Sequence, residues 1–308
     1  MKNILIIKHG SLGDIISSTA AIKPIRDYYN NSNITILTSK KFYYFFDKSN
    51  LSNYIIADNR RGLINFFKII NTILAKKFDL IIDLQNSNRT LVYSFFIRFF
   101  SSSKINGTNF FSHFRFKYDK TNPPHVIKGL GKQIELIGIN ILNKPYLEWL
   151  HDPKFIMQEL ADKKYFIVNP GCSYKNRIKR WSSRNFALIC SYLVNKNIIP
   201  VVIGTEEDEA TINEIKNIEN NILNLCNKSP VEVIYNLAFK ALGALSNDTG
   251  PAHLIAATNC KIHLVLSSFS NTNTVIPKSE NVTFSKSEHI DDISTEKVII
   301  QIEKIINK

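Results

Sequence analysis

The stretch Ile4–Ile16, ILIIKHGSLGDII, decides the fold, because a short apolar run breaks into a glycine-punctuated turn and ends on an acid. The apolar run predicts a buried strand, and the residues after Gly13 predict the start of a helix. Asp14 at this turn is either a partner for the helix dipole or a catalytic base at the carboxyl edge of a parallel sheet, where such folds bind ligands. The sequence outside this stretch has to distinguish the two.

Strand-like apolar segments alternate with helix-like amphipathic segments on both sides of a polar stretch near 145–164. Strands are predicted at 34–38, 54–58 and 79–85 in the first half, and at 165–171 and 199–205 in the second. Such alternation is typical of βαβ units and parallel sheets. We therefore expect an α/β fold with two doubly wound, Rossmann-like domains that face each other across a cleft.

The predicted domain boundary falls at residue 150. Residues 1–150 would form the N-terminal domain and residues 151–308 the C-terminal one. The length of 308 residues favours two domains over one core. A terminal helix is predicted at 294–307, and packing back on the N-terminal domain is one place for it.

Composition narrows the class of protein. With 44% hydrophobic and 21% charged residues, the chain is expected to be a soluble globular protein, and no stretch approaches the roughly 18 unbroken apolar residues of a membrane span. The N-terminus shows no signal-peptide pattern, so a cytoplasmic protein is expected. The four cysteines are scattered without paired spacing and predict neither a zinc site nor a disulfide framework: Cys172, Cys190, Cys226 and Cys260.

Positive charge is concentrated in the first half of the chain. Residues 1–150 hold 21 Lys and Arg against 9 Asp and Glu, a net charge of +12, whereas residues 151–308 hold 18 against 17, a net of +1. A lysine-rich coding bias would have affected both halves. The asymmetry indicates an anionic partner for the N-terminal half, such as nucleic acid, a membrane surface, or a phosphorylated or carboxylated acceptor.

Two segments of the second half have the composition of anion-binding loops. In YFIVNPGCSYKNRIKRW (165–181) a strand runs into a loop of backbone amides, a hydroxyl and cations, which suits a pyrophosphate but also a solvated basic loop. In SNDTGPAHLIAA (246–257) a polar turn leads into a helix with Pro251 in its first turn, and His253 follows one turn later. The alternative there is an ordinary capped helix with a structural histidine.

A strand followed by four acids, VVIGTEEDEA (201–210), lies between these segments. An acid just past a strand end is the usual partner of ribose hydroxyls in doubly wound folds, although an acidic first helical turn explains most of the run without a ligand. The chain has no GxxxxGK[ST] loop, no GxSxG elbow, no metal-spaced histidine pair and no Asp–x–Asp triplet.

Taken together, these segments resemble the glycosyltransferases that add heptose to the inner core of lipopolysaccharide, glycosyltransferase family 9. LIIKHGSLGDIISSTAAIKPIR resembles that family's first strand, Gly–Asp turn and helix, and IVNPGCSYKNRIKRW its phosphate loop. IGTEEDE resembles the following strand and acid, and NDTGPAHLIAA the motif for the donor diphosphate. The four segments occur in the family's order and cover nearly the whole chain, although Ser182 stands where the family often has proline.

The resemblance implies a fold of the GT-B type and an inverting transfer from ADP-heptose to Kdo–lipid A or heptosylated core. Asp14 would be the general base and Lys179 the cation that stabilises the departing diphosphate. Glu206 or Asp208 would reach the ribose. The remaining donor-binding residues would be Ser173, Asp248, Thr249, Gly250 and His253. No metal site and no required cofactor are implied, with Mg²⁺ at most a stimulant.

The resemblance also gives the basic half an acceptor. Arg60, Arg61, Gln85 and Arg89 would bind the anionic lipid A–Kdo acceptor, since arginine suits a bidentate contact with a carboxylate. The aromatic and basic run at 109–120 would rest on the anionic inner-membrane leaflet, or else is a surface loop. The protein would then be cytoplasmic and peripheral to the membrane, and no nucleic-acid partner is expected.

Two alternatives remain open at this point. Another nucleotide-sugar glycosyltransferase or an epimerase of the GT-B fold would share the motifs, although an epimerase would have little use for a basic acceptor half. A non-catalytic module that binds anionic ligands would need the basic half but not Asp14, Lys179 and Asp248 together.

Overall fold

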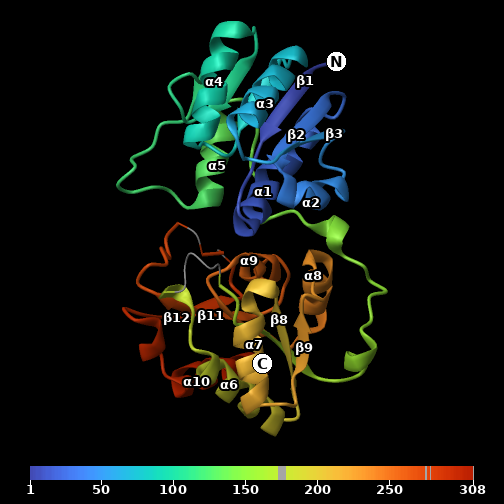
Figure 1. Cartoon of the computed structure of the whole chain (residues 1–308), viewed down its shortest axis with the longest axis vertical. Coiled ribbons are helices and arrows are strands. Elements are labelled where there is room, and N and C mark those ends of the chain that lie inside the picture. The colour runs from blue at the N-terminus through green and yellow to red at the C-terminus, as the bar shows by residue number, and fades with distance from the viewer. Residues whose placement is uncertain (173–177, 275, 278, 308) are drawn as a thin grey trace. The chain divides into compact units, whose positions relative to one another are not determined.

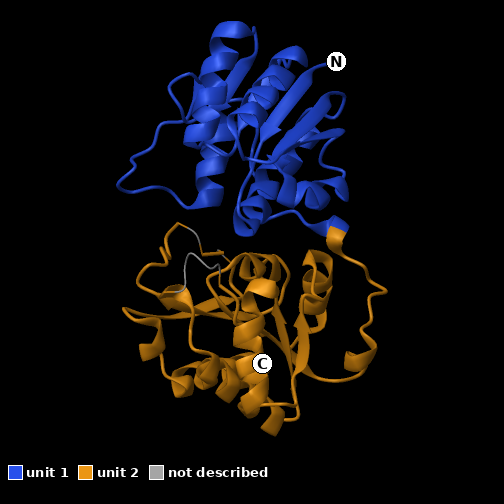
Figure 2. Ribbon diagram, viewed as in Figure 1, with its two compact units in different colours: residues 1–149 blue, residues 150–308 orange. Residues whose placement is uncertain are grey.

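The chain forms two compact units, which Figure 2 shows in separate colours: unit 1, Met1–Trp149, and unit 2, Leu150–Lys308. The structure is a computed structural model, and each unit is described by itself. The described residues are 1–172, 178–274, 276–277 and 279–307.

Unit 1 is built on a six-stranded, wholly parallel sheet with the order β3-β2-β1-β4-β5-β6. Its strands are β1 (Asn3–Ile7), β2 (Asn33–Ser39), β3 (Tyr54–Asp58), β4 (Leu80–Asp83), β5 (Lys104–Gly107) and β6 (Phe114–Arg115). β1, β2 and β4 are buried along nearly their whole length, because helices cover both faces of a parallel sheet. The direction of strand addition reverses between β1 and β4, which makes this the switch point of the sheet.

The helices of unit 1 pack in pairs, α1 against α5 and α3 against α4 (Figure 1). They are α1 (Leu12–Tyr28), α2 (Tyr43–Asp47), α3 (Leu63–Ala75), α4 (Asn88–Phe100) and α5 (Val126–Glu135), with a 3-10 turn η1 (Lys40–Phe42) before α2. Between the sheet and the α3–α4 pair lies an apolar core that includes Leu5, Ile70 and Ile97.

Unit 2 repeats the topology with the order β12-β11-β10-β7-β8-β9, again all parallel. The strands are β7 (Tyr165–Asn169), β8 (Ile199–Gly204), β9 (Leu223–Cys226), β10 (Ala244–Asn247), β11 (Ile262–Ser267) and β12 (Val282–Ser287). Its switch point lies between β7 and β10. Both units thus have the strand order of Rossmann-like domains, and the predicted GT-B fold class is confirmed.

The helices of unit 2 are α6 (Ser183–Asn195), α7 (Glu209–Ile218), α8 (Val231–Lys240), α9 (Gly250–Ala256) and α10 (Thr295–Ile306). Short 3-10 turns are η2 (Glu148–Leu150), η3 (Gln158–Leu160), η5 (Glu206–Asp208) and η6 (Ile290–Asp292). None of the helices in the described residues is long and apolar enough to cross a membrane.

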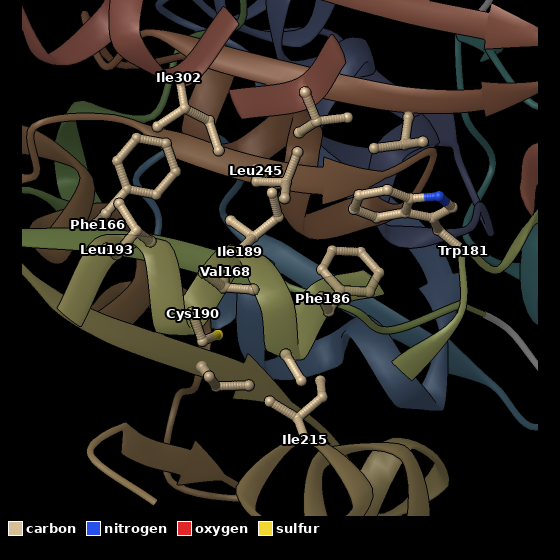
Figure 3. Close-up of a cluster of buried hydrophobic side chains, with 14 of the residues drawn as sticks. Phe166, Val168, Trp181, Phe186, Ile189, Cys190, Leu193, Ile215, Leu245 and Ile302 are labelled. Carbon is tan, nitrogen blue, oxygen red and sulfur yellow. The ribbon is translucent and has the colours of Figure 1, made fainter. Parts of the chain in front are cut away.

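The terminal helix α10 belongs to the core of unit 2. Val298, Ile302 and Ile305 pack in the same apolar cluster as Phe166 and Trp181, part of which Figure 3 shows. The apolar face of the helix is therefore used inside unit 2. Its residues follow the helical period that brings one apolar stripe onto a core.

The sequence patterns missed several elements. β10 lies in a segment that reads as an apolar turn, and the aromatic middle of unit 1 contains α4, β5 and β6. β5, β6 and β10 hold four residues or fewer, which carry too little periodicity to recognise. The 13 residues of α4 have apolar and aromatic side chains around most of the helix, so no polar face marks its period.

A buried histidine in unit 2 predicts a pH-dependent stability. The His263 ring lies 2.8 Å from Thr283 Oγ1 and 3.0 Å from Ser285 Oγ, and burial, with a smaller effect of Lys304, lowers its pKa to about 4. Its ordinary pKa is about 6.5, so the stability linked to neutral His263 is present above that pH and lost as the pH falls towards 4. Between pH 7 and 5 this should cost about 2 kcal/mol of unfolding free energy.

Urea unfolding at the two pH values tests this. The His263→Gln variant should lose about 2 kcal/mol less than the wild type on acidification, whatever its stability at pH 7. The exposed His289 supplies the control, since His289→Gln should keep the wild-type pH dependence. Equal losses in His263→Gln and wild type would contradict the prediction.

Candidate functional site

The predicted site residues gather at the carboxyl ends of the central strands in each unit. In unit 1, Asp14 lies in the first turn of α1, the helix after β1. Gln85 lies in the loop after β4, and Arg89 lies in the first turn of α4 that follows it. In unit 2 the loop after β7 leads to Lys179, and the loop after β10 carries Asp248 and Thr249. These are the switch points, where doubly wound sheets leave room for a ligand.

Asp14 is part of a helix cap in unit 1. Its Oδ2 accepts hydrogen bonds from the Ser11 backbone N–H (3.1 Å) and the Ser11 hydroxyl (3.0 Å), and Ser11 is the N-cap of α1. Asp14 occupies the third helical position of this capping box. Both bonds use Oδ2, so Oδ1 takes no part in the cap. The Asp14 side chain is half-buried.

Gln85 fixes the turn between β1 and α1, the helix that contains Asp14. Its Oε1 accepts hydrogen bonds from the backbone N–H groups of His9 (3.0 Å) and Gly10 (2.9 Å). Gly10 has φ +52°, a left-handed conformation that favours glycine. The predicted acceptor residue Gln85 thus joins the end of β4 to the β1–α1 turn, and its carbonyl positions that turn.

Lys8 is a buried cation at the same switch point that sequence reasoning missed. Its Nζ donates to the Leu84 carbonyl at 3.1 Å, and burial lowers its pKa against the charges of Asp14 and Asp83. Burial also raises the pKa of Asp83, whose Oδ1 accepts the N–H groups of Gln85 and Asn86. The sequence signal for this buried cation was the position of Lys8 directly after the apolar run ILII, at the end of the predicted strand.

Arg89 is bound within unit 1. Its Nε and Nη2 donate to Asp58 at 3.0 and 3.1 Å, and Tyr93 Oη and Asn65 Nδ2 donate to the same carboxylate. Burial acts to raise the pKa of Asp58, but these donors and the Arg60 N–H hold it below its usual range. The guanidinium predicted to bind an acceptor carboxylate therefore binds the chain's own Asp58.

Arg60 and Arg61 are both exposed after β3. Arg60 has φ +58° and gives its backbone N–H to Asp58 Oδ1 at 2.7 Å, so its side chain takes no part in that bond. Of the three predicted arginines, these two present exposed side chains at the carboxyl edge of the sheet.

In unit 2, Asp208 is a structural acid. Its Oδ2 accepts the Thr205 N–H and hydroxyl, and its Oδ1 accepts Arg180 Nη2 at 2.9 Å and the Cys172 N–H at 3.3 Å. The side chain is buried, whereas Glu206 is exposed. The sequence left both acids open as ribose partners, and the geometry favours Glu206.

Lys179 and Asp248 form an ion pair next to the end of β10. Lys179 Nζ lies 3.0 Å from Asp248 Oδ2, which also accepts the Ser270 hydroxyl at 2.8 Å. Two predicted donor residues from segments about 70 positions apart thus meet. Ser173, predicted beside them, lies outside the described residues.

The turn before α9 is fixed by buried asparagines. Asn169 Nδ2 donates to Thr249 Oγ1 and to Ser246 Oγ, both at 2.8 Å. Asn247 Oδ1 accepts the Trp181 N–H, and its Nδ2 donates to the Pro170 carbonyl. Asn247 was not singled out from the sequence, and it joins the ends of β7 and β10.

The other predicted donor residues near this turn, Gly250 and His253, lie in the first turn of α9. Gly250 begins α9 with Pro251 after it, and the half-buried His253 follows in the first turn. Ser182, at the position of the expected proline, caps α6 by accepting the Asn185 N–H at 3.2 Å. In the described part of the chain, no group of three or more His, Cys, Asp or Glu side chains is placed to hold a metal ion.

Residues 66–289 match the model of glycosyltransferase family 9 (heptosyltransferase), a segment that covers well over half of the chain. The chain belongs to glycosyltransferase family 9. The matched segment contains the predicted donor residues, Gln85 and Arg89, and begins after Asp14 and the two exposed arginines.

Two curated relatives of this family 9 chain carry heptosyltransferase names. Lipooligosaccharide heptosyltransferase 2 of Campylobacter jejuni subsp. jejuni serotype O:2 is 32% identical over 134 residues, 42% of this chain and 40% of that protein. Lipopolysaccharide core heptosyltransferase OpsX of Haemophilus influenzae is 23% identical over 273 residues, 82% of this chain and 75% of that protein. The first match spans less than half of the relative's own length.

Solved structures share the fold. The glycosyl transferase family 9 structure from Veillonella parvula has a TM-score of 0.79 at 18% identity and covers 99% of this chain and 97% of that one. E. coli heptosyltransferase WaaC with ADP-2-deoxy-2-fluoro heptose reaches 0.74 at 14%, covering 98% and 99%. The UDP-GlcNAc 2-epimerase of Methanocaldococcus jannaschii reaches 0.64 at 14%, covering 99% and 92%.

The Asp58–Arg89 pair yields a stability test on this family 9 chain. Arg89→Ala leaves a buried carboxylate without its bidentate partner and should lower the unfolding free energy by about 3 kcal/mol. Arg60→Ala removes an exposed side chain and keeps the N–H to Asp58, so it should change stability by less than about 0.5 kcal/mol. Urea unfolding of the two variants measures both values, and similar stabilities would refute the structural role of Arg89.

Proposed function

We propose that this family 9 chain is an inverting glycosyltransferase that transfers heptose from ADP-heptose to the inner core of lipopolysaccharide, either Kdo–lipid A or heptosylated core. The family match and the names of the two curated relatives support the sugar and the acceptor. The observation that carries the chemistry is the half-buried Asp14 at the switch point of unit 1, in the first turn of α1, which follows a turn held by Gln85.

The donor would bind at the switch point of unit 2. Lys179 supplies a cation for the diphosphate, beside Asp248 and the turn of Thr249 and Gly250, with His253 one turn into the helix. Ser173 remains a proposed donor contact outside the described residues. Glu206 is the exposed acid for the ribose. The E. coli structure with an ADP-heptose analogue has the same fold, which supports an ADP-linked donor.

The proposed reaction is a single displacement. Asp14 accepts the proton of the acceptor hydroxyl as that oxygen attacks the anomeric carbon, and the carbon–oxygen bond to the diphosphate breaks. The configuration inverts, and ADP leaves with the bonding electron pair. Lys179 stabilises the charge that develops on the diphosphate. No metal is assigned a step.

The acceptor would meet the exposed side chains of Arg60 and Arg61. Carboxylated sugars on a phosphorylated lipid carry the negative charge that the +12 of residues 1–150 attracts. Gln85 and Arg89 would act indirectly, by holding the β1–α1 turn and Asp58. The second candidate is a nucleotide-sugar epimerase, which the shared fold of the M. jannaschii enzyme favours. An epimerase has no acceptor to explain the basic half.

A donor titration tests the function directly. Calorimetry with ADP, UDP, GDP and ADP-heptose should show selective binding of the ADP-linked ligands, and Kdo–lipid A should gain heptose in the presence of EDTA. Selective UDP binding with epimerised sugar and no transfer would replace the proposal with the epimerase. Absence of any nucleotide binding would leave only a module for anionic ligands.

The Asp14→Asn variant separates the base from the helix cap. Asparagine Oδ1 accepts the same Ser11 donors, so stability and ADP binding should stay at wild-type level. Turnover should fall at least about a hundredfold, because the amide does not accept a proton. Ser11→Ala is the matched control: it should cost about 1 kcal/mol of stability while most turnover survives. Wild-type turnover in Asp14→Asn would reduce Asp14 to a helix cap.

Replacing the carboxylate by an amide should affect ligand binding at Glu206 and stability at Asp208. Glu206→Gln should weaken ADP binding about tenfold without changing stability, since a charged acceptor of ribose hydroxyls is lost. Asp208→Asn should instead lower the unfolding free energy by about 2 kcal/mol, because Arg180 loses its partner. Calorimetric titration and urea unfolding distinguish the two, and unchanged ADP affinity in Glu206→Gln would remove the ribose assignment.

A further inference from the structure

The outer surface of the α3–α4 pair exposes large apolar side chains that a soluble surface helix normally replaces with charge. Ile64 on α3 is 89% exposed, and Phe99 and Phe100 at the end of α4 are 64% and 67% exposed. Phe110, in the segment between β5 and β6, is 76% exposed. α3 contains one charged residue, Lys68, and neither α3 nor α4 contains an acid. We call the surface formed by Leu63, Ile64, Phe67, Phe99, Phe100 and Phe110 the aromatic face.

The aromatic face is continuous across three segments. α3 packs beside α4 (Figure 1), and the Phe67 and Phe96 rings lie 6.3 Å apart. Phe111 stands 6.2 Å from Phe99, and its neighbour Phe110 lies 5.8 Å away. A shallow hollow on α3 beside Ile64 and Phe67 extends the surface. Contiguous exposed apolar surface of this kind marks an interaction site.

The surroundings of the aromatic face are cationic. Residues 60–120 hold 11 Lys and Arg against 3 Asp and Glu, and one of those three acids, Asp83, is buried. Lys68, Arg98, Lys104, Arg115 and Lys117 are all exposed in or next to the three segments. Aromatic side chains favour the interfacial region of a bilayer, and each nearby Lys or Arg adds about 1 kcal/mol of attraction to an anionic leaflet.

We propose that the aromatic face is a membrane-docking surface, which inserts its apolar side chains among the headgroups of an anionic bilayer while the flanking cations bind lipid phosphates. A second copy of the chain is the less favourable occupant, because it would bring the same excess of positive charge against the surface. The docking surface is independent of the donor and acceptor roles proposed above, since none of its residues belongs to the proposed site.

Vesicle binding of the full chain tests the proposal. Wild-type protein should float with phosphatidylcholine vesicles that contain phosphatidylglycerol and should bind pure phosphatidylcholine vesicles weakly. Phe99→Ser/Phe100→Ser should lower the partition coefficient at least about tenfold, because two exposed rings are no longer available to enter the bilayer interface. The matched control, Ile218→Ser/Ile300→Ser, removes two half-exposed apolar side chains from unit 2 and should bind like the wild type.

A variant with fewer cations separates the contribution of charge from that of the apolar side chains to vesicle binding. Lys68→Gln/Lys117→Gln should lose the preference for phosphatidylglycerol and much of the salt dependence, but keep the weak binding to neutral vesicles. Equal partitioning of Phe99→Ser/Phe100→Ser and wild type would overturn the proposal. So would a dimer in sedimentation velocity that the same variant abolishes, because the face would then join two copies.

Failure of the docking surface is distinguishable from failure of the proposed function. Phe99→Ser/Phe100→Ser should transfer sugar to a water-soluble acceptor without acyl chains at the wild-type rate and lose rate only with acceptor embedded in vesicles. A chain that binds vesicles but transfers nothing to either acceptor would refute the glycosyltransferase and support the docking surface. A rate lost equally with both acceptors, in a variant with an unchanged melting temperature, would overturn the docking surface.

Discussion

Buried aspartates at the carboxyl edge of each sheet hold the loops on which the proposed chemistry depends. Asp58 is the last residue of β3 in unit 1, and Asp208 lies in the turn η5 that follows β8 in unit 2. Both accept hydrogen bonds from elements far away in sequence. A carboxylate removed from water is stable only when such donors surround it. Loss of one donor lowers the free energy of unfolding, because the buried charge is then less well compensated. The positions of Arg89 and Arg180 therefore follow from the need to satisfy these two acids.

Side-chain amides hold the loops at both switch points by hydrogen bonds to backbone groups. Gln85 accepts two backbone N–H groups of the β1–α1 turn, and Asn247 connects the Trp181 N–H to the carbonyl of Pro170. An amide has both a donor and an acceptor, so each of these side chains satisfies two backbone groups of a neighbouring loop without introducing a charge. This arrangement keeps the central loops in place while Asp14, Lys179 and Glu206 remain at or near the surface of their units.

Charge and apolar exposure are divided unequally between the units. Unit 1 carries nearly all of the excess positive charge together with the aromatic face, whereas the charges of unit 2 nearly balance. The proposed acceptor, which is lipid-anchored and anionic, and the proposed donor, a soluble nucleotide sugar, would make different demands on a protein surface. The first is met by cations and interfacial aromatic rings. The second is met by a small number of polar groups at a helix start and one cation.

The sequence by itself determined the α/β alternation, the division into two Rossmann-like domains, the resemblance to glycosyltransferase family 9 and the charge asymmetry. These follow from local periodicity, short motifs and composition, which need no knowledge of distant contacts. Asp14, Lys179 and Asp248 became candidates in this way, because each belongs to a motif that follows a strand.

Only the tertiary structure decided which of the candidate polar residues are engaged inside the protein. Arg89 meets Asp58, and Arg180 meets Asp208, through bonds between residues 31 and 28 positions apart. Lys8 and Gln85 acquired their roles in the same way, across 76 positions. Local sequence cannot distinguish an arginine that awaits a ligand from one that neutralises a buried acid, because the difference lies in which strands of the sheet become neighbours.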